Sequence, residues 1–279
     1  MIKYLCECIG VSRSGYYNYL NNEKFREIKE TLDEKVRDII LIAYNKRGFK
    51  KGAKSIKMVL EKEHNIIYNL KRIRRIMKKY NITCPFRKAN PYRKIAKATK
   101  EHSTVENKLK RKFKEGKPKE ILLTDITYLF YGKSKKCYLS VIKDSVTNEI
   151  LVWNLSENLT LDISIDTIKK LKNKKFKINS NAYIHSDQGV HYTSPTFQKI
   201  LKKYKIGQSM SRRGNCWDNA PQESFFGHMK DEINLENCTT YEDVYNEIKR
   251  YINYYNNFRY QWNLKKMTPV EYRNHLLYA

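Results

Sequence analysis

The sequence predicts an α/β protein of the α+β type, with a helical N-terminal region followed by a mixed core of strands and helices. Three observations predict this division. Apolar residues recur at helical spacing up to about residue 80, residues 81–119 are basic and interrupted by Pro and Gly, and β-branched runs begin after Glu120. We therefore divide the chain into a helix–turn–helix-like helical region (1–80), a basic linker (81–119) and a mixed core with C-terminal helices (120–279).

The charge of the chain indicates a polyanionic partner. Its 279 residues include 56 Lys and Arg against 29 Asp and Glu, a net charge of +27. The excess is +11 in residues 1–80, +10 in residues 81–119 and +6 in residues 120–279. Basic residues that neutralise phosphates release condensed counterions, which favours binding. This distribution therefore favours DNA binding by residues 1–119 and catalysis by residues 120–279. A ribosomal or membrane-surface protein would show the same overall balance.

Cysteine spacing and hydropathy limit the class of protein further. None of the six cysteines forms a pair with zinc-site spacing, and reduced thiols are the simpler interpretation. No apolar run reaches about 18 residues, and no signal-peptide core precedes the first helix. We expect a cytoplasmic, nucleoid-associated protein with no membrane partner.

The N-terminal region is predicted to contain two helical units. Residues 2–20 form a small helix–turn–helix with a turn at Gly10 and an N-cap at Ser12, where DNA contact and a frayed helix pair are equal alternatives. Further helices are expected at about 33–44, at about 53–63 and after the N-cap Asn69.

The third of these later helices has a basic face opposite its apolar one. We select Arg72, Arg75 and Lys79 on this face as DNA-binding candidates. The alternative is an exposed helix whose charges only keep it soluble.

In the core, residues 121–131, 138–146 and 149–155 read as an antiparallel meander of three strands. The remaining predicted elements are a helix at 161–171, a strand at 182–185, a helix at 195–204, a strand at 207–210, and helices at 220–235 and 241–256.

Three acids lie on separate predicted elements of this core: Asp125, Asp187 and Glu223. Hard cations take oxygen ligands, and two metal ions about 4 Å apart can hold the attacking and leaving oxygens of a phosphoryl transfer. Asp144 competes as the first acid. We prefer Asp125 because it interrupts an apolar strand, where a carboxylate is costly unless it is paired or bound to metal.

The sequences around the acids resemble those of the DDE transposases of bacterial insertion sequences. Asp187 lies in His-Ser-Asp-Gln-Gly-Val-His-Tyr-Thr-Ser and Glu223 in Asn-Cys-Trp-Asp-Asn-Ala-Pro-Gln-Glu-Ser-Phe-Phe, with 35 residues between the two acids. Segments 254–262 and 267–272 match the family as well. The chain is similar to the OrfB type, whose prototype is insertion sequence number three, and the resemblance implies an RNase H-like, retroviral-integrase-like core.

The resemblance also implies roles for individual residues. Asp125, Asp187 and Glu223 would bind two Mg²⁺ ions, with Mn²⁺ able to substitute. His185, Ser186 and Asn219 would support the acids. The DNA-binding candidates of the core are Lys230, Arg212, Arg213 and Trp217. Lys230 shares a helix face with Glu223, and Trp217 is either a stacking platform for an unpaired base or a core anchor.

The expected function is Mg²⁺-dependent cleavage of double-stranded DNA at the element ends, followed by strand transfer by the freed 3′-hydroxyl. The family implies a homo-oligomer on DNA and an upstream-frame protein joined by ribosomal frameshifting. Two alternatives stay open: a non-catalytic DNA-binding regulator or subunit, and a metal-dependent nuclease that never joins ends.

Overall fold

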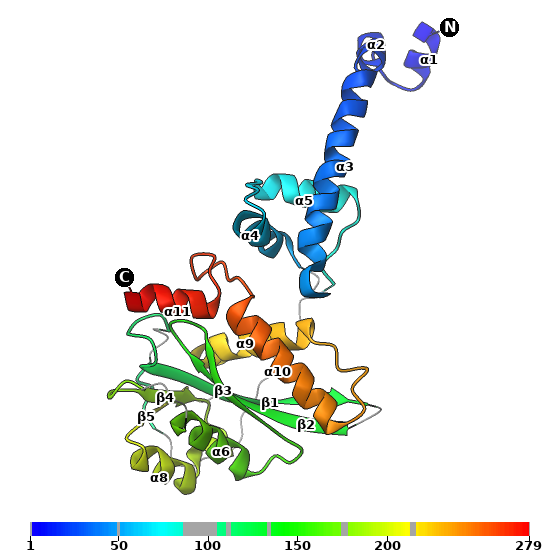
Figure 1. Cartoon of the computed structure of the whole chain (residues 1–279). Coiled ribbons are helices and arrows are strands. Elements are labelled where there is room, and N and C mark those ends of the chain that lie inside the picture. Colours follow the sequence, from blue (N-terminus) through cyan, green and yellow to red (C-terminus); the bar gives the residue numbers. More distant parts are fainter. Residues whose placement is uncertain are drawn as a thin grey trace. The chain divides into compact units, whose positions relative to one another are not determined.

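The computed structural model describes residues 2–48, 51–85, 105–109, 113–132, 135–173, 178–212 and 216–278. The chain forms two compact units, Met1–Pro85 and Phe86–Ala279 (Figure 1). Most of the predicted basic linker lies outside the described residues, so its linker character stays a prediction. No described helix is both long enough and apolar enough to cross a bilayer.

The first unit is entirely helical in its described part. Its elements are α1 (Ile2–Cys8), α2 (Arg13–Asn21), α3 (Glu23–Asn45), the 3₁₀ turn η1 (Lys46–Gly48), α4 (Ala53–Glu63) and α5 (Leu70–Lys79). Ser12 and Asn69 are the predicted N-caps, and each accepts a backbone N–H through its side-chain oxygen, from Gly15 and Lys71 respectively. Helix α3 begins ten residues before the predicted start. Its first turns are built from good helix formers that bury little, so apolar periodicity does not reveal them.

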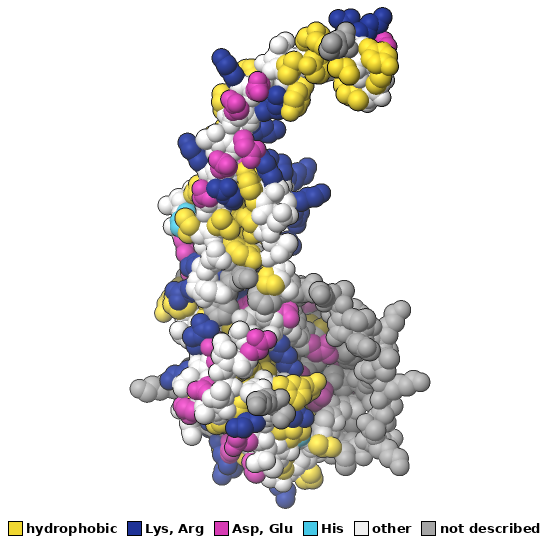
Figure 2. Space-filling model, turned by 90° about the vertical axis from the view of Figure 1, so that its right-hand side faces the viewer, with side chains coloured by type: hydrophobic (Ala, Val, Ile, Leu, Met, Phe, Trp, Pro, Cys, Tyr) yellow, Lys and Arg dark blue, Asp and Glu magenta, His cyan; other side chains and the backbone are white. Residues whose placement is uncertain are grey.

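Helices α3, α4 and α5 share an apolar core in which Ile40, Ile56, Leu60, Ile73 and Ile76 are completely buried. The N-terminal helix pair has a much smaller core. Only Cys6 is buried in α1 and α2, whereas Leu5 and Leu20 are 52% and 43% exposed. Figure 2 shows hydrophobic side chains at the surface around the N-terminus.

A network of ion pairs joins α3 to α5. The Arg75 guanidinium donates to both carboxylate oxygens of Asp33 at 2.7 and 2.6 Å, and Lys79 Nζ donates to Asp33 at 2.9 Å. Lys79 also pairs with Glu30, which accepts from the Tyr80 hydroxyl at 2.8 Å. Asp33 is only 3% exposed, and the hydrogen bond from Arg75 holds the pKa of this carboxyl far below its usual range.

The second unit is built on a five-stranded mixed sheet with the order β3-β2-β1-β4-β5. Its strands are β1 (Ile121–Tyr131), β2 (Lys135–Asp144), β3 (Ile150–Ser156), β4 (Tyr183–Ser186) and β5 (Gly207–Met210). The first three are antiparallel neighbours, which confirms the predicted meander, while β4 runs parallel to β1 and β5 parallel to β4. The predicted fold class, a helical front followed by an α/β core, is confirmed.

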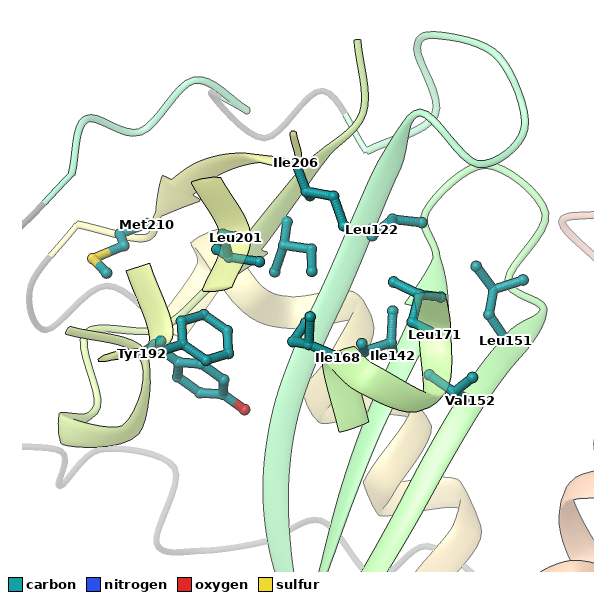
Figure 3. Packing of buried hydrophobic residues seen from close by; sticks show 12 residues of the cluster. Leu122, Ile142, Leu151, Val152, Ile168, Leu171, Tyr192, Leu201, Ile206 and Met210 are labelled. Carbon is teal, nitrogen blue, oxygen red and sulfur yellow. The ribbon is translucent and has the colours of Figure 1, made fainter. Parts of the chain in front are cut away.

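Helices cover both faces of this sheet (Figure 1). They are α6 (Leu161–Lys172), α7 (Val190–Thr193), α8 (Pro195–Lys203), the 3₁₀ turn η2 (Cys216–Asn219), α9 (Ala220–Glu232), α10 (Tyr241–Asn257) and α11 (Pro269–Tyr278). Figure 3 shows Leu122 and Ile142 of the sheet packing with Ile168 and Leu171 of α6 and Leu201 of α8. Side chains alternate along a strand, so Lys143 points to the opposite face, where its Nζ reaches Pro221 of α9.

We predict that Asp33→Asn destabilises the helical unit by about 2–4 kcal/mol, because it leaves two cations beside a buried amide. Hydrogen exchange of α3 and α5 amides in the full chain measures the loss. The control is Asp38→Asn, whose pair with Arg37 leaves the Asp38 side chain 61% exposed, so a change below about 0.5 kcal/mol is expected there. Equal losses in both variants would contradict a structural role for Asp33.

Candidate active site

The three predicted acids come from three elements that the sheet topology brings to one place. Asp125 lies in the middle of β1, Asp187 directly follows β4, the parallel neighbour of β1, and Glu223 lies in the first turn of α9. Asp125 and Asp187 are half-buried, and Glu223 is exposed. Their elements are therefore neighbours in space although the first and last acids are far apart in sequence.

Electrostatics group the three acids together. Burial raises the pKa of Asp125 to about 8, together with the charge of Asp187 and, more weakly, that of Glu223. The backbone N–H of Ile126, which donates to Asp125 at 2.8 Å, and the charge of Lys230 act in the opposite direction. Because such charge effects decline with distance, Asp187, Glu223 and Lys230 lie close enough to Asp125 to influence its ionisation.

The turn after β4 fixes Asp187. Its Oδ1 accepts the backbone N–H of Gly189 at 2.9 Å. A Cβ atom at position 189 would lie only 2.9 Å from the same oxygen, so a larger residue would push the carboxylate out of this position. The Asp-Gln-Gly part of the motif is thus explained by space around the acid.

Asp144, the competing first acid, has a different role. It is fully buried at the end of β2, where its oxygens accept the backbone N–H groups of Lys119, Val146 and Thr147. These hydrogen bonds use the carboxylate to shape the turn before β3. Neither Asp187 nor Glu223 is among the groups that shift the pKa of Asp144, which favours Asp125 as the first acid.

The chemistry of the three acids fits a hard divalent cation. Three carboxylates on neighbouring elements make a negatively charged site that needs a counter-charge, and oxygen is the donor that Mg²⁺ prefers. Among the described residues, no three His, Cys, Asp or Glu side chains already stand in a metal-holding group. By donor type, the three carboxylates suit Mg²⁺.

His185, one of the predicted supporting residues, is completely buried two residues before Asp187. Its Nε2 lies 3.0 Å from the carbonyl oxygen of Asp218 and its Nδ1 lies 2.9 Å from Ser209 Oγ. Burial lowers the pKa of this imidazole, so the neutral form donates from Nε2 and accepts at Nδ1. Ser209 in turn accepts the backbone N–H of Lys108 at 2.9 Å. His185 thus ties β4 to β5 and to the turn before α9.

Asp218 was missed in the sequence, although it stands beside the chosen Asn219. Its side chain is completely buried. One carboxylate oxygen accepts from Asn107 Nδ2 at 2.8 Å and from Arg212 Nε at 3.0 Å, and the other accepts from Arg212 Nη2 at 3.1 Å. The Trp-Asp-Asn run of the motif was the available signal. Asp218 connects the end of β5 and residues 105–109 to the turn that leads into Glu223.

Lys143 was also missed, although a single lysine in an apolar strand gives the same signal as Asp125. It is 2% exposed, and its Nζ donates to the Pro221 carbonyl at 2.5 Å. Burial lowers the pKa of this amine to about 7. Since Pro221 lies in the first turn of α9, Lys143 anchors the helix start that carries Glu223.

Tyr192, within the motif that follows Asp187, is a third residue that sequence reasoning passed over. It is 2% exposed, and its ring packs edge-on against Phe197 at 5.4 Å (Figure 3). Burial, then the charges of Asp125 and Asp187, raise the pKa of its hydroxyl well above the usual value. The hydroxyl therefore lies near both aspartates, where the apolar core meets the acids.

The other predicted support residues have local contacts. Ser186 is buried and its hydroxyl donates to the Asp187 carbonyl at 2.9 Å. Asn219 is 5% exposed, and its Oδ1 has no hydrogen-bond partner among the described residues. The side-chain amide of Gln222 is buried and equally unmatched in that part of the chain. Unmatched polar groups therefore gather in the turn and first helical turn around Glu223.

The predicted DNA-binding residues divide into two groups. Lys230 Nζ lies 4.4 Å from the Tyr128 ring centroid, near Asp125, and Arg72 lies 4.7 Å over the Tyr68 ring. Arg75 and Lys79 form ion pairs with Asp33, and Arg212 forms one with Asp218. These carboxylates partly neutralise the three cations, which leaves less of their positive charge for DNA phosphates. Arg213 and the side chain of Trp217 lie outside the described residues.

Comparisons with protein families cover most of the chain. Two models described as Integrase core domain match residues 115–216 and 223–277, and a model described as HTH-like domain matches residues 31–90. With the mixed sheet, these matches confirm the predicted order of an HTH-like region and an RNase H-like integrase core.

Individual relatives agree with these models. InsK, the transposase assigned to insertion sequence element IS150 of Escherichia coli (strain K12), is 33% identical over 269 residues, covering 95% of this chain and 90% of that protein. InsF, the transposase of IS3A in the same organism, is 26% identical over 285 residues, covering 98% and 94%. An uncharacterized transposase-like protein of Haemophilus influenzae is 38% identical over 62% of this chain and 79% of that protein.

Solved structures include more distant matches. The catalytic core domain of HTLV-2 integrase in complex with magnesium is 20% identical, with a TM-score of 0.45 over 56% of this chain and 97% of that one. The catalytic core domain of BIV integrase is 15% identical, with a TM-score of 0.41 over 58% of this chain and 99% of that one.

We predict that Lys143 makes stability depend on pH. The unfolded chain holds this proton up to about pH 10.5, whereas the folded chain holds it only up to about pH 7. The unfolded state therefore binds more protons between these values, and stability rises with pH in that window. From pH 7 to pH 9, the free energy of urea unfolding should rise by about 2 kcal/mol more in the wild type than in Lys143→Met.

Lys249→Met, at an exposed position on α10, is the matched control and should keep the wild-type dependence on pH. Parallel curves for the wild type and Lys143→Met would show that the buried amine does not titrate in this range.

Proposed function

Because this chain belongs to the IS3 family of insertion-sequence transposases, we propose that it is a DDE-type enzyme that cleaves DNA at the element ends and transfers the freed strands to a target. The observation that carries the proposal is that Asp125, Asp187 and Glu223 come from neighbouring elements, and that the charges of Asp187 and Glu223 raise the pKa of Asp125. Three carboxylates on neighbouring strands and a flanking helix of an integrase-type core suit metal-assisted phosphoryl transfer.

In this proposal the three carboxylates hold the catalytic metal and the surrounding residues keep them in place. Two Mg²⁺ ions, with Mn²⁺ able to substitute, would activate the attacking oxygen and stabilise the leaving one. Gly189 leaves room for the Asp187 carboxylate, and Lys143 and Asp218 secure the start of the helix that bears Glu223. Lys230, beside Asp125, would contact the phosphates of the element end.

The proposed partners follow from the same function. The substrate is double-stranded DNA, bound by Arg72 in the helical unit and by Lys230 in the core. Cleaving two ends and joining both to one target requires more than one active site, so we propose a homo-oligomer assembled on DNA. An upstream-frame protein, joined by frameshifting, would supply a further DNA-binding region.

We predict that Glu223→Gln abolishes cleavage and joining, with a loss of at least about 10³-fold, because a neutral amide replaces a charged metal ligand. DNA binding should survive. The measurement uses a labelled duplex that carries the element end, incubated with Mg²⁺, with cleaved and joined products separated on a denaturing gel. Glu236→Gln, an exposed acid beyond the end of α9, is the control and should keep wild-type activity.

Three outcomes distinguish the candidate functions. Activity retained in Glu223→Gln would remove this residue from the site. Cleaved but never joined ends from the wild type would indicate a nuclease. Retarded DNA without reaction from the wild type would indicate a binding subunit or regulator.

We also predict that Mg²⁺ stabilises the folded chain through Asp125. Without metal, Asp125→Asn should be more stable than the wild type at pH 8 by about 1–3 kcal/mol, because it removes a buried charge beside two others. At 10 mM Mg²⁺ the melting temperature should rise in the wild type and stay constant in Asp125→Asn. Asp166→Asn, an exposed acid of α6, should respond like the wild type. An equal rise in Asp125→Asn would refute metal binding at this carboxylate.

A further inference from the structure

The net positive charge of the core comes from one stretch of sequence. Residues 167–217 contain 12 Lys and Arg and a single acid, Asp187. The rest of the core, residues 120–166 and 218–279, contains 11 Lys and Arg against 16 Asp and Glu. The net +6 of the core therefore comes entirely from residues 167–217, and the remainder is acidic.

In the fold, this stretch places exposed lysines on two adjacent helices, α6 and α8, and in the turn that follows α8. We define the α6–α8 lysine surface by its exposed side chains, which are Lys169, Lys170, Lys172, Lys199, Lys202, Lys203 and Lys205. The helices share the apolar cluster of Figure 3, in which Ile168 and Leu171 of α6 pack near Leu201 of α8. Lys172 Nζ lies 5.9 Å from the Tyr204 ring centroid, which joins the two lysine groups directly.

The α8 part of the surface lies at the end of the sheet away from the acids. Helix α8 ends just before β5, and the first residue of β5, Gly207, pairs with Tyr183, the first residue of β4. Asp187 follows the other end of β4. At about 3.3 Å per residue, the length of β4 separates the two ends by roughly 13 Å. The lysines at the end of α8 and in the turn after it are thus outside the catalytic cluster.

Internal pairing accounts for only part of this charge. Lys169 pairs with Asp166 at 2.9 Å, and Lys170 donates to Asn154 at 2.6 Å. The other five lysines have no ion pair with any described residue. Lysines in the last turn of a helix also interact favourably with the negative end of the helix dipole. That end carries only about half a negative charge, which one lysine would already balance. Seven exposed ammonium groups exceed that need.

We propose that the α6–α8 lysine surface binds the phosphate backbone of duplex DNA beyond the nucleotides being cleaved. This inference rests on the proposed function and adds a second DNA contact to it. Lysine ammonium groups are flexible point charges that suit phosphates, and the surface has no arginine fork for base recognition. Binding there is therefore independent of sequence and strongly dependent on salt.

The test compares two triple variants of the full chain. Lys199→Gln, Lys202→Gln and Lys203→Gln together neutralise the α8 part of the surface, and Lys249→Gln, Lys265→Gln and Lys266→Gln are the matched control on α10 and the segment after it. Affinity for a 40-base-pair duplex without element sequence is measured from 50 to 200 mM salt. The slope of log K against log salt should fall by about 2–3 in the α8 variant and stay constant in the control. Equal slopes in all three proteins, with circular dichroism unchanged, would overturn the proposal.

Two further arms separate the source of the DNA from the catalytic proposal. A minimal end duplex should still be cleaved by the α8 variant. Lost joining to a target plasmid with normal cleavage assigns the surface to target DNA, whereas weakened binding of a long end duplex with normal joining of bound ends assigns it to the element. A reduced slope together with no cleavage by the wild type would support the surface while refuting the catalytic function.

Discussion

A carboxylate in the middle of an apolar strand is the constraint on which the core depends. Asp125 interrupts β1, and its ionisation is opposed by burial and by Asp187 and Glu223. Such a group weakens the fold unless its surroundings are fixed around it. Three neighbouring residues fix these surroundings. Gly189 leaves room for the Asp187 carboxylate, His185 links β4 to the turn before α9, and Lys143 holds the start of α9. The acids are dispersed in sequence, and the polar contacts behind them keep them together.

Much of this organisation was predictable from sequence, because it depends on local pattern. The meander, the N-caps and the acids in their motifs all follow from neighbouring residues. The contacts that support the site do not. Lys143 meets Pro221 across 78 positions, and Asn107 meets Asp218 across 111. A single sequence does not show which distant polar groups will contact one another. Asp218 and Tyr192 were therefore not predicted as site residues, although neighbouring residues were. The early start of α3 was not predicted for another reason. Its first turns are mostly exposed, so their sequence lacks the apolar periodicity from which a helix is predicted.

Basic residues in this chain have two uses that composition cannot separate. Arg75, Lys79 and Arg212 were selected as DNA contacts, yet each is held by a buried carboxylate within its own unit. By contrast, the lysines of α6 and α8 drew no attention in sequence, where they look like ordinary solvated helix ends. A net charge of +27 therefore overstates the charge available to DNA in some places and conceals it in others.

The short segment 105–109 has a consequence for anyone who divides the chain. Asn107 and the backbone of Lys108 supply hydrogen bonds to Asp218 and Ser209, the two residues that flank His185. A fragment that begins at the first strand, near Glu120, would lack both donors and leave a buried carboxylate and a buried hydroxyl short of partners. Such a truncated core would be expected to be poorly behaved or inactive for reasons unrelated to DNA binding. A fragment that begins at residue 105 or earlier keeps the hydrogen bonds from Asn107 to Asp218 and from Lys108 to Ser209.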